Sequence, residues 1–222
     1  MKTGKPARIL VVEDDDIVRD LIAAILRTNG YDVVEAMDGM SGLVAAKSEQ
    51  PDLAVLDLHL PDFTGVELAG MIQPEVAFIV LTVDSTQAHV QACIDRGALG
   101  YLLKPPRAED LVRQIQLAIR QGKEQQNLRR ALQQTQTINK ALGILMGYLG
   151  LSEEQAHRVL VARATAQRIK VADLAEQVIE AFHSANQFCR ANAHVGTVTP
   201  EMRQARAFLK RFKMGIHLSR DS

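Results

Sequence analysis

The 222-residue sequence predicts an α/β domain with a doubly wound, five-stranded parallel sheet, followed by a long helix and a small all-α domain of three helices. Two observations predict this arrangement. The front half alternates short apolar runs with segments of helical spacing, whereas the back half up to residue 182 has helical spacing only. Because the apolar runs are continuous, they are typical of strands buried on both faces of a parallel sheet.

Five apolar runs, rich in Val, Ile and Leu, are the expected strands. The segments between them have helical spacing, as the positions of Ile17, Leu21, Ala24 and Ile25 illustrate. Strands that alternate with helices indicate successive βα units. The runs are RILVV at 8–12, DVVEA at 32–36, LAVLD at 53–57, AFIVLT at 77–82 and GYLLK at 100–104.

Polar side chains stand at the ends of four of these runs. Glu13 and Asp14 follow the first run, and Asp57, Thr82 and Lys104 end the third, fourth and fifth. Ligands of open parallel sheets bind beyond the carboxyl ends of the strands, so these side chains should converge there. Carboxylates brought together repel one another unless a cation neutralises them, and oxygen ligands favour Mg²⁺. A lysine and a hydroxyl beside the cation suit a phosphoryl group.

The region from about Arg8 to Arg120 resembles the receiver domain of bacterial two-component response regulators, which has a flavodoxin-like fold. The motifs ILVVEDDD, PDLAVLDLHLPDFTG, IVLT and GYLLKP occur in order and at close to the family spacing. The resemblance implies that Asp57 accepts a phosphoryl group from a sensor histidine kinase. It implies the following further roles: Glu13, Asp14, Asp57 and the backbone carbonyl of His59 as Mg²⁺ ligands, Thr82 and Tyr101 as a switch pair, and Lys104 as the phosphate partner.

Two features depart from the receiver pattern. The segment between Gly65 and Thr82 is a few residues shorter than in the family, so a short third helix is expected. The side chain of His59 is hypothesised to alter the hydrolysis rate of the acyl phosphate. We expect no enzyme activity beyond the receiver's own aspartyl phosphorylation and dephosphorylation.

A helical pattern begins after Pro106 and continues across residues 121–135 towards the back half. Its apolar positions from Leu128 onwards repeat about every 3.5 residues, which favours a long signalling helix or a short coiled coil that forms a homodimer. The alternative is a receiver helix that ends at a polar break over residues 122–127, with a new helix after it. The pattern does not decide between the two.

Three helical segments follow between Leu128 and Phe182. Gly150 indicates the end of the first. Ser152 with Gln155 three residues later is a capping-box signal for the start of the second. Gly143 and Gly147 lie one helical turn apart, which predicts a surface where another helix packs closely.

The stretch INKALGILMGYLGLSEEQAHRVLVARATAQRIKVADLAEQVI resembles the ANTAR domain, the RNA-binding output module of antiterminator response regulators. The matching elements are AxGILM, GLSE and ADLAEQVI. The resemblance implies binding to hairpin leader RNA and transcription antitermination. Leu142 stands where the family usually has a lysine. The candidate RNA contacts are Arg129, Arg130, Lys140, Tyr148, Arg158, Arg163, Arg168 and Lys170.

The charge distribution agrees with two different functions in one chain. Residues 1–122 contain 11 Lys+Arg and 18 Asp+Glu, a balance of −7, whereas residues 123–222 contain 15 and 8, a balance of +7. A basic half suits an anionic partner such as RNA. Two alternatives stay open: a DNA-binding regulator with a helix-turn-helix, and an output module that sequesters a protein without binding nucleic acid.

The sequence predicts four regions: a receiver at 1–120, a helical linker at 121–135, an ANTAR-like domain at 136–183 and an extension at 184–222. The helix is expected to decay into a loop beyond His183, and a basic amphipathic helix restarts after Thr199 with Leu209 and Phe212 on its apolar face. This helix could pack on the three-helix domain, extend the RNA contact or block the output. No apolar run is long enough for a membrane span, so we expect a cytoplasmic protein.

Overall fold

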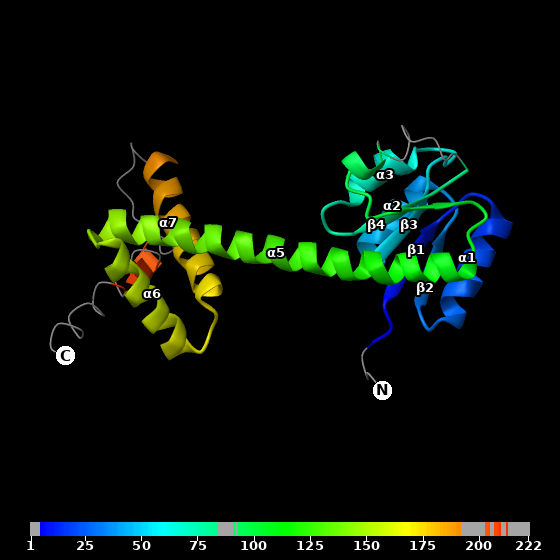
Figure 1. Cartoon of the computed structure of the whole chain (residues 1–222). Helices are drawn as coiled ribbons and strands as arrows, with labels where there is room; N and C mark the ends of the chain where they lie inside the picture. The colour runs from blue at the N-terminus through cyan, green and yellow to red at the C-terminus, as the bar shows by residue number, and fades with distance from the viewer. Residues whose placement is uncertain are drawn as a thin grey trace. The chain divides into compact units, whose positions relative to one another are not determined.

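A computed structural model of the chain describes residues 5–83, 91, 93–191, 203–204, 207–209 and 212, and within these the side chains of all but 185–191. The chain divides into two compact units, Met1–Leu128 and Arg129–Ser222. We call them the front unit and the back unit (Figure 1).

The front unit is built on a sheet of five parallel strands in the order β2-β1-β3-β4-β5 (Figure 1). Val12 at the end of β1 lies opposite both Ala36 and Leu56, so the neighbouring strands end at one edge. The predicted fold class and the five strands are confirmed, and the last two strands are one and two residues shorter than predicted. The strands are β1 (Arg8–Val12), β2 (Asp32–Ala36), β3 (Leu53–Asp57), β4 (Phe78–Thr82) and β5 (Tyr101–Leu103).

Helices cover both faces of this sheet. Side chains alternate along a strand, so Leu10 and Val12 of β1 join a core with α2 and α3 on one face. Ile9 and Val11 join a second core with α1 and α5 on the other face. The expected short third helix is confirmed at eight residues. The helices are α1 (Asp16–Thr28), α2 (Gly39–Glu49), α3 (Gly65–Ile72) and the first part of α5 (Ala108–Leu149).

Helix α5 is continuous for 42 residues, so the predicted alternative of a break over residues 122–127 is wrong. The polar stretch lies against the front unit instead. A Cβ on Gly122 would lie 2.7 Å from the Cβ of Ala77, and Gln126 donates a hydrogen bond of 2.9 Å to the carbonyl of Glu75. Neither α5 nor any other helix within the described residues combines the length and apolar character that a membrane crossing requires.

The back unit consists of the end of α5 with α6 (Glu153–Gln167) and α7 (Val171–Ala191). Gly150 ends α5 with a φ of +68°, and Ser152 forms the predicted capping box with Gln155. The prediction that the last helix decays beyond residue 183 is wrong, because α7 continues to Ala191. The core of the back unit contains Leu145 from α5, Leu160 from α6, and Leu174 and Val178 from α7.

The C-terminal region adds two side chains to this core. Leu209 and Phe212 are fully buried in it, and the Phe208 and Phe212 rings meet edge to face with centroids 5.5 Å apart. Of the three roles considered for the C-terminal helix, this contact shows packing on the three-helix unit. The Thr199 cap predicted for that helix lies outside the described residues.

Two of the three glycines of α5, Gly143 and Gly147, do not serve the predicted close packing. A Cβ at Gly143 or Gly147 would have no heavy atom within 4 Å among the described residues, apart from its chain neighbours and the backbone of its own helix. The glycines instead leave space at the surface of the back unit. Leu142, at the position where a lysine was expected, is buried in the core.

Candidate functional site

An acidic site lies where β1 and β3 end in the front unit. Glu13 follows β1 and is completely buried, and Asp57 is the buried last residue of β3. Asp14 is exposed. One oxygen from each of these three carboxylates lies within 4.8 Å of the others. The three carboxylates therefore converge at the carboxyl edge of the sheet, as predicted.

Lys104 follows β5 and contacts two of these carboxylates. Its Nζ lies 2.7 Å from Oε1 and 2.6 Å from Oε2 of Glu13, and 2.8 Å from Oδ2 of Asp57. The peptide bond from Lys104 to Pro105 is cis. The lysine sits where it would meet a group bound to Asp57, which is the position that a phosphate partner requires.

Burial controls the electrostatics of this site. It raises the pKa of Glu13, and the hydrogen bond from Lys104 opposes that rise only in part. Burial lowers the pKa of Lys104, but the hydrogen bonds and charges of Asp57 and Glu13 together raise it above its ordinary value. The ammonium group therefore stays charged at neutral pH.

The donor set of the acidic site fits a divalent cation. Three carboxylates converge, and Lys104 supplies one positive charge between two of them, so negative charge is in excess. Hard oxygen ligands of this kind suit Mg²⁺. His59 lies beside the site. Its backbone N–H donates a hydrogen bond of 3.3 Å to Oδ1 of Asp57, and the residue is exposed.

The two expected switch residues differ in position. Thr82 ends β4 and is buried, and the residue before it, Leu81, pairs with Asp57. Tyr101 begins β5 opposite Val80, and its side chain is exposed. The structure therefore brings Thr82 to the acidic edge and leaves the Tyr101 ring at the surface.

Two residues of the site escaped the sequence prediction. A Cβ on Gly65 would lie 2.0 Å from the carbonyl oxygen of Asp57, so a glycine lets α3 begin directly against Asp57. Its place in the segment PDFTG is a signal that could have found it. Arg19 donates a hydrogen bond of 2.8 Å from Nη1 to the carbonyl of Glu13. The sequence contains no spacing signal for that contact.

The candidate RNA contacts do not form one surface. Lys140 and Tyr148 line a groove of about 490 Å³ on the back unit, which we call the α5–α7 groove. Gly143 and Gly147 leave it open. Its other lining residues are Ile144, Ile179, Phe182 and His183.

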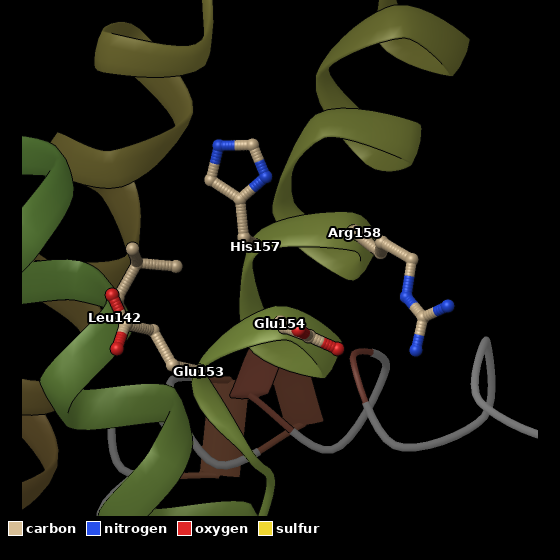
Figure 2. A pocket seen from close by; sticks show the side chains of 5 residues that line it. All are labelled: Leu142, Glu153, Glu154, His157 and Arg158. Carbon is tan, nitrogen blue, oxygen red and sulfur yellow. The ribbon is translucent and has the colours of Figure 1, made fainter.

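Arg158 lines a different pocket of about 410 Å³, together with Leu142, Glu153, Glu154 and His157 (Figure 2). Arg158 extends on the side of α6 away from Leu142 (Figure 2). The two glutamates in this pocket would repel a phosphate.

The remaining candidates are distributed over several elements. The guanidinium of Arg163 lies 4.6 Å from the centroid of the Phe212 ring, a cation–π contact that uses this side chain in packing. Arg168 caps α6 in the left-handed conformation with a φ of +57°, and Lys170 next to α7 is exposed. Arg129 and Arg130 are exposed on α5, away from the α5–α7 groove residues along the helix.

Comparisons with known proteins match both units. The sequence profile of the response regulator receiver domain matches residues 9–116, and that of the ANTAR domain matches residues 126–179. The transcriptional regulatory protein PdtaR of Mycobacterium tuberculosis is 31% identical over 185 residues, which cover 79% of this chain and 90% of PdtaR. The DNA-binding response regulator MtrA of Mycolicibacterium smegmatis is 30% identical over 120 residues, 53% of each chain.

Solved structures match the front of the chain. A CheY-like receiver domain protein from Methanospirillum hungatei aligns with a TM-score of 0.51 at 29% identity, covering 54% of this chain and 98% of that one. NtrX from Brucella abortus aligns with a TM-score of 0.53 at 29% identity, and the alignment covers 57% of this chain and 29% of NtrX.

Proposed function

Because the chain belongs to the response regulators that join a receiver domain to an ANTAR output domain, we propose that it is a phosphorylation-controlled antiterminator that binds hairpin leader RNA. The observation that carries this proposal is the ANTAR match next to a receiver whose acidic site is complete. A sensor histidine kinase supplies the phosphoryl group. The kinase and the leader RNA both act on this chain in the cytoplasm.

Asp57 is the proposed phosphoacceptor. Its carboxylate attacks the phosphorus of a phosphohistidine, and the new O–P bond forms as the P–N bond to the imidazole breaks. Mg²⁺, held by Glu13, Asp14, Asp57 and the carbonyl of His59, would neutralise charge on the transferring group. Lys104 contacts a phosphoryl oxygen from the position that it already occupies beside Asp57. No reaction on another substrate is proposed.

The acyl phosphate then acts as a switch. It adds negative charge and strong hydrogen-bond acceptors at the end of β3. Thr82 lies at the end of the neighbouring strand and donates its hydroxyl to the new group. Tyr101, whose ring is exposed in the unphosphorylated chain, moves into the space that Thr82 leaves.

The α5–α7 groove supports RNA binding by the back unit. Lys140 provides a positive charge at its edge, and the Tyr148 side chain is 41% exposed and free to stack on a base. Gly143 and Gly147 leave room for a nucleotide against the helix backbone. The balance of +7 in residues 123–222 adds long-range attraction for RNA.

A protein-capturing output is the second candidate. The pocket beside Leu142 favours it, because Glu153 and Glu154 line an opening with apolar surface and repel phosphate. Such a pocket suits a basic side chain of a protein partner better than a nucleic acid.

Binding of the full chain to a paired-hairpin leader RNA, a scrambled hairpin and duplex DNA tests the proposal. The measurement is made with and without phosphorylation, across a salt series that removes nonspecific phosphate attraction. We expect hairpin-selective binding that phosphorylation strengthens, and Asp57→Asn should abolish that strengthening. Tyr148→Ala should weaken binding about fivefold or more, as lost base stacking does.

Lys170→Gln is the comparison for Lys140→Gln: both lysines are candidate contacts and both variants lose the same charge, but Lys170 does not line the α5–α7 groove. It should weaken binding less than Lys140→Gln does. Equal, salt-sensitive binding to all three nucleic acids, or no binding at all, would contradict the RNA proposal and favour the protein-capturing output.

A further inference from the structure

Arg19 lies next to the acidic site without being one of its expected ligands. It comes from the first turn of α1, and its side chain is only 14% exposed. One nitrogen, Nη1, donates a hydrogen bond of 2.8 Å to the carbonyl oxygen of Glu13. The same guanidinium forms an ion pair with Asp16 and lies 3.9 Å from Oε2 of Glu35.

These contacts hold the main chain of Glu13 from both sides. Its N–H donates to the carbonyl of Ala36 on β2 at 3.1 Å, which prolongs the sheet ladder by one residue. Its carbonyl accepts from Arg19. Hydrogen bonds at both backbone groups fix the direction in which the Glu13 side chain leaves the main chain, and charge-assisted hydrogen bonds are the stronger ones.

The direction of the Glu13 side chain matters because two cations would share it. Lys104 already contacts both oxygens of the Glu13 carboxylate. A divalent cation among Glu13, Asp14 and Asp57 would draw the same group, so an anchor that is independent of Lys104 keeps the ligand in position.

We propose that Arg19 is a positioning residue for the divalent cation: it holds the backbone of Glu13 so that the buried carboxylate stays directed at Asp14 and Asp57. The inference rests on the proposed Mg²⁺ site. It predicts that the affinity for the cation depends on a side chain that does not touch the cation, as outer partners of metal ligands commonly do.

A calorimetric titration of the full chain with Mg²⁺ measures the Kd and tests this role. Arg19→Gln should raise the Kd for Mg²⁺ about tenfold, because loss of an outer partner typically costs 10- to 100-fold in affinity. Arg19→Lys keeps the charge but loses the planar fork, so its Kd should lie between those of the parent and Arg19→Gln.

Arg27→Gln is the matched control. Arg27 lies on the same helix and forms an ion pair of 2.6 Å with the same Glu35, but its side chain is 53% exposed and has no contact with Glu13 in the described structure. Its Kd for Mg²⁺ should equal that of the parent. Thermal unfolding without metal checks that the Arg19 variants are folded, and a merely structural role would move the melting temperature rather than the Kd.

The outcomes separate two failures. If the parent chain does not bind Mg²⁺, the proposed metal site is wrong and the role of Arg19 falls with it. If the parent binds Mg²⁺ and Arg19→Gln binds it equally well, the metal site stands and the positioning role is wrong. Should Arg19→Gln not fold, Arg19→Lys decides: parent affinity would overturn the role, and a weakened affinity supports it.

Discussion

The acidic site combines a completely buried carboxylate, Glu13, with a partly buried lysine, Lys104, where three strands end. Glu13 and Asp57 would repel each other in a site of low dielectric, and the ammonium of Lys104 lies between them at 2.6 to 2.8 Å. This arrangement is costly without a cation, because desolvation of charged groups is only partly offset. The site is therefore prepared for the ligands that it is proposed to bind.

The raised pKa of Glu13 predicts a pH dependence of stability. A group whose folded pKa is raised stabilises the fold fully below its unfolded pKa, here about 4.5, and that contribution is lost as pH rises through the folded pKa. The free energy of unfolding of the metal-free chain should therefore fall as pH rises from 4.5 towards neutral, relative to Glu13→Gln. Urea unfolding at a series of pH values measures it.

Lys104 contributes no slope in that pH window. Its folded pKa is raised above 10.5, so its stabilisation is complete below 10.5 and is lost only at higher pH. Parallel pH profiles for the parent and Glu13→Gln between 4.5 and 7 would contradict the assignment of the slope to Glu13.

At the scale of elements, tertiary contacts decide where the helices begin, end and pack. The polar stretch of α5 from Gly122 to Gln126 lies on the front unit, and Lys123 lies 3.4 Å from Oδ1 of Asp52. Leu209 and Phe212 supply core side chains to the back unit, beyond the end of the ANTAR match at residue 179. The core of the back unit thus extends past the C-terminal end of the family profile.

Phe212→Ala tests that extension of the core. Because the side chain is fully buried, its removal should destabilise the back unit by about 3–5 kcal/mol, the usual cost of a Phe→Ala change in a core. Urea unfolding, monitored by circular dichroism, measures the decrease in the free energy of unfolding. Phe208→Ala is the control: Phe208 is only partly buried, so the loss should be smaller.

An unchanged free energy of unfolding in Phe212→Ala would mean that the C-terminal region is no part of the core. In that case Arg163 would also lose its assigned packing role, since its guanidinium lies over the Phe212 ring.

At the scale of the whole molecule, helix α5 has residues in both units, and the two halves of the chain carry opposite net charges. Residues 1–122 carry −7 and residues 123–222 carry +7. Leu128 and Leu132 of α5 are 63% and 55% exposed, one helical turn apart. An exposed apolar seam on a long helix is typical of a helix that pairs with a second copy.

We expect the phosphorylated chain to form a dimer through this seam. Leu132→Lys should shift the phosphorylated protein towards the monomer, because a charge in an apolar seam must be desolvated on pairing. Sedimentation at micromolar concentration measures the shift. Gln134→Lys is the control, as it adds the same charge to an exposed position of α5 outside the seam. A parent chain that stays monomeric when phosphorylated would contradict the prediction.

Local and periodic features of the sequence determined the sheet and much of the acidic site. Five continuous apolar runs predict buried parallel strands, and Glu13, Asp57 and Lys104 converge because the carboxyl ends of parallel strands share one edge. The capping box of Ser152 and the stop at Gly150 are likewise local, since backbone geometry within a few residues sets them.

Only the tertiary structure decided the features that depend on residues far apart in the chain. The contact of Gly122 with Ala77 turns an apparent break into a continuous helix, and the space at Gly143 and Gly147 forms a groove rather than a packed face. Arg19 lies only six residues after Glu13, but the three-dimensional turn between β1 and α1, rather than a sequence spacing, brings its guanidinium to the Glu13 carbonyl. No periodicity encodes such contacts, because each depends on how separate elements are placed against one another.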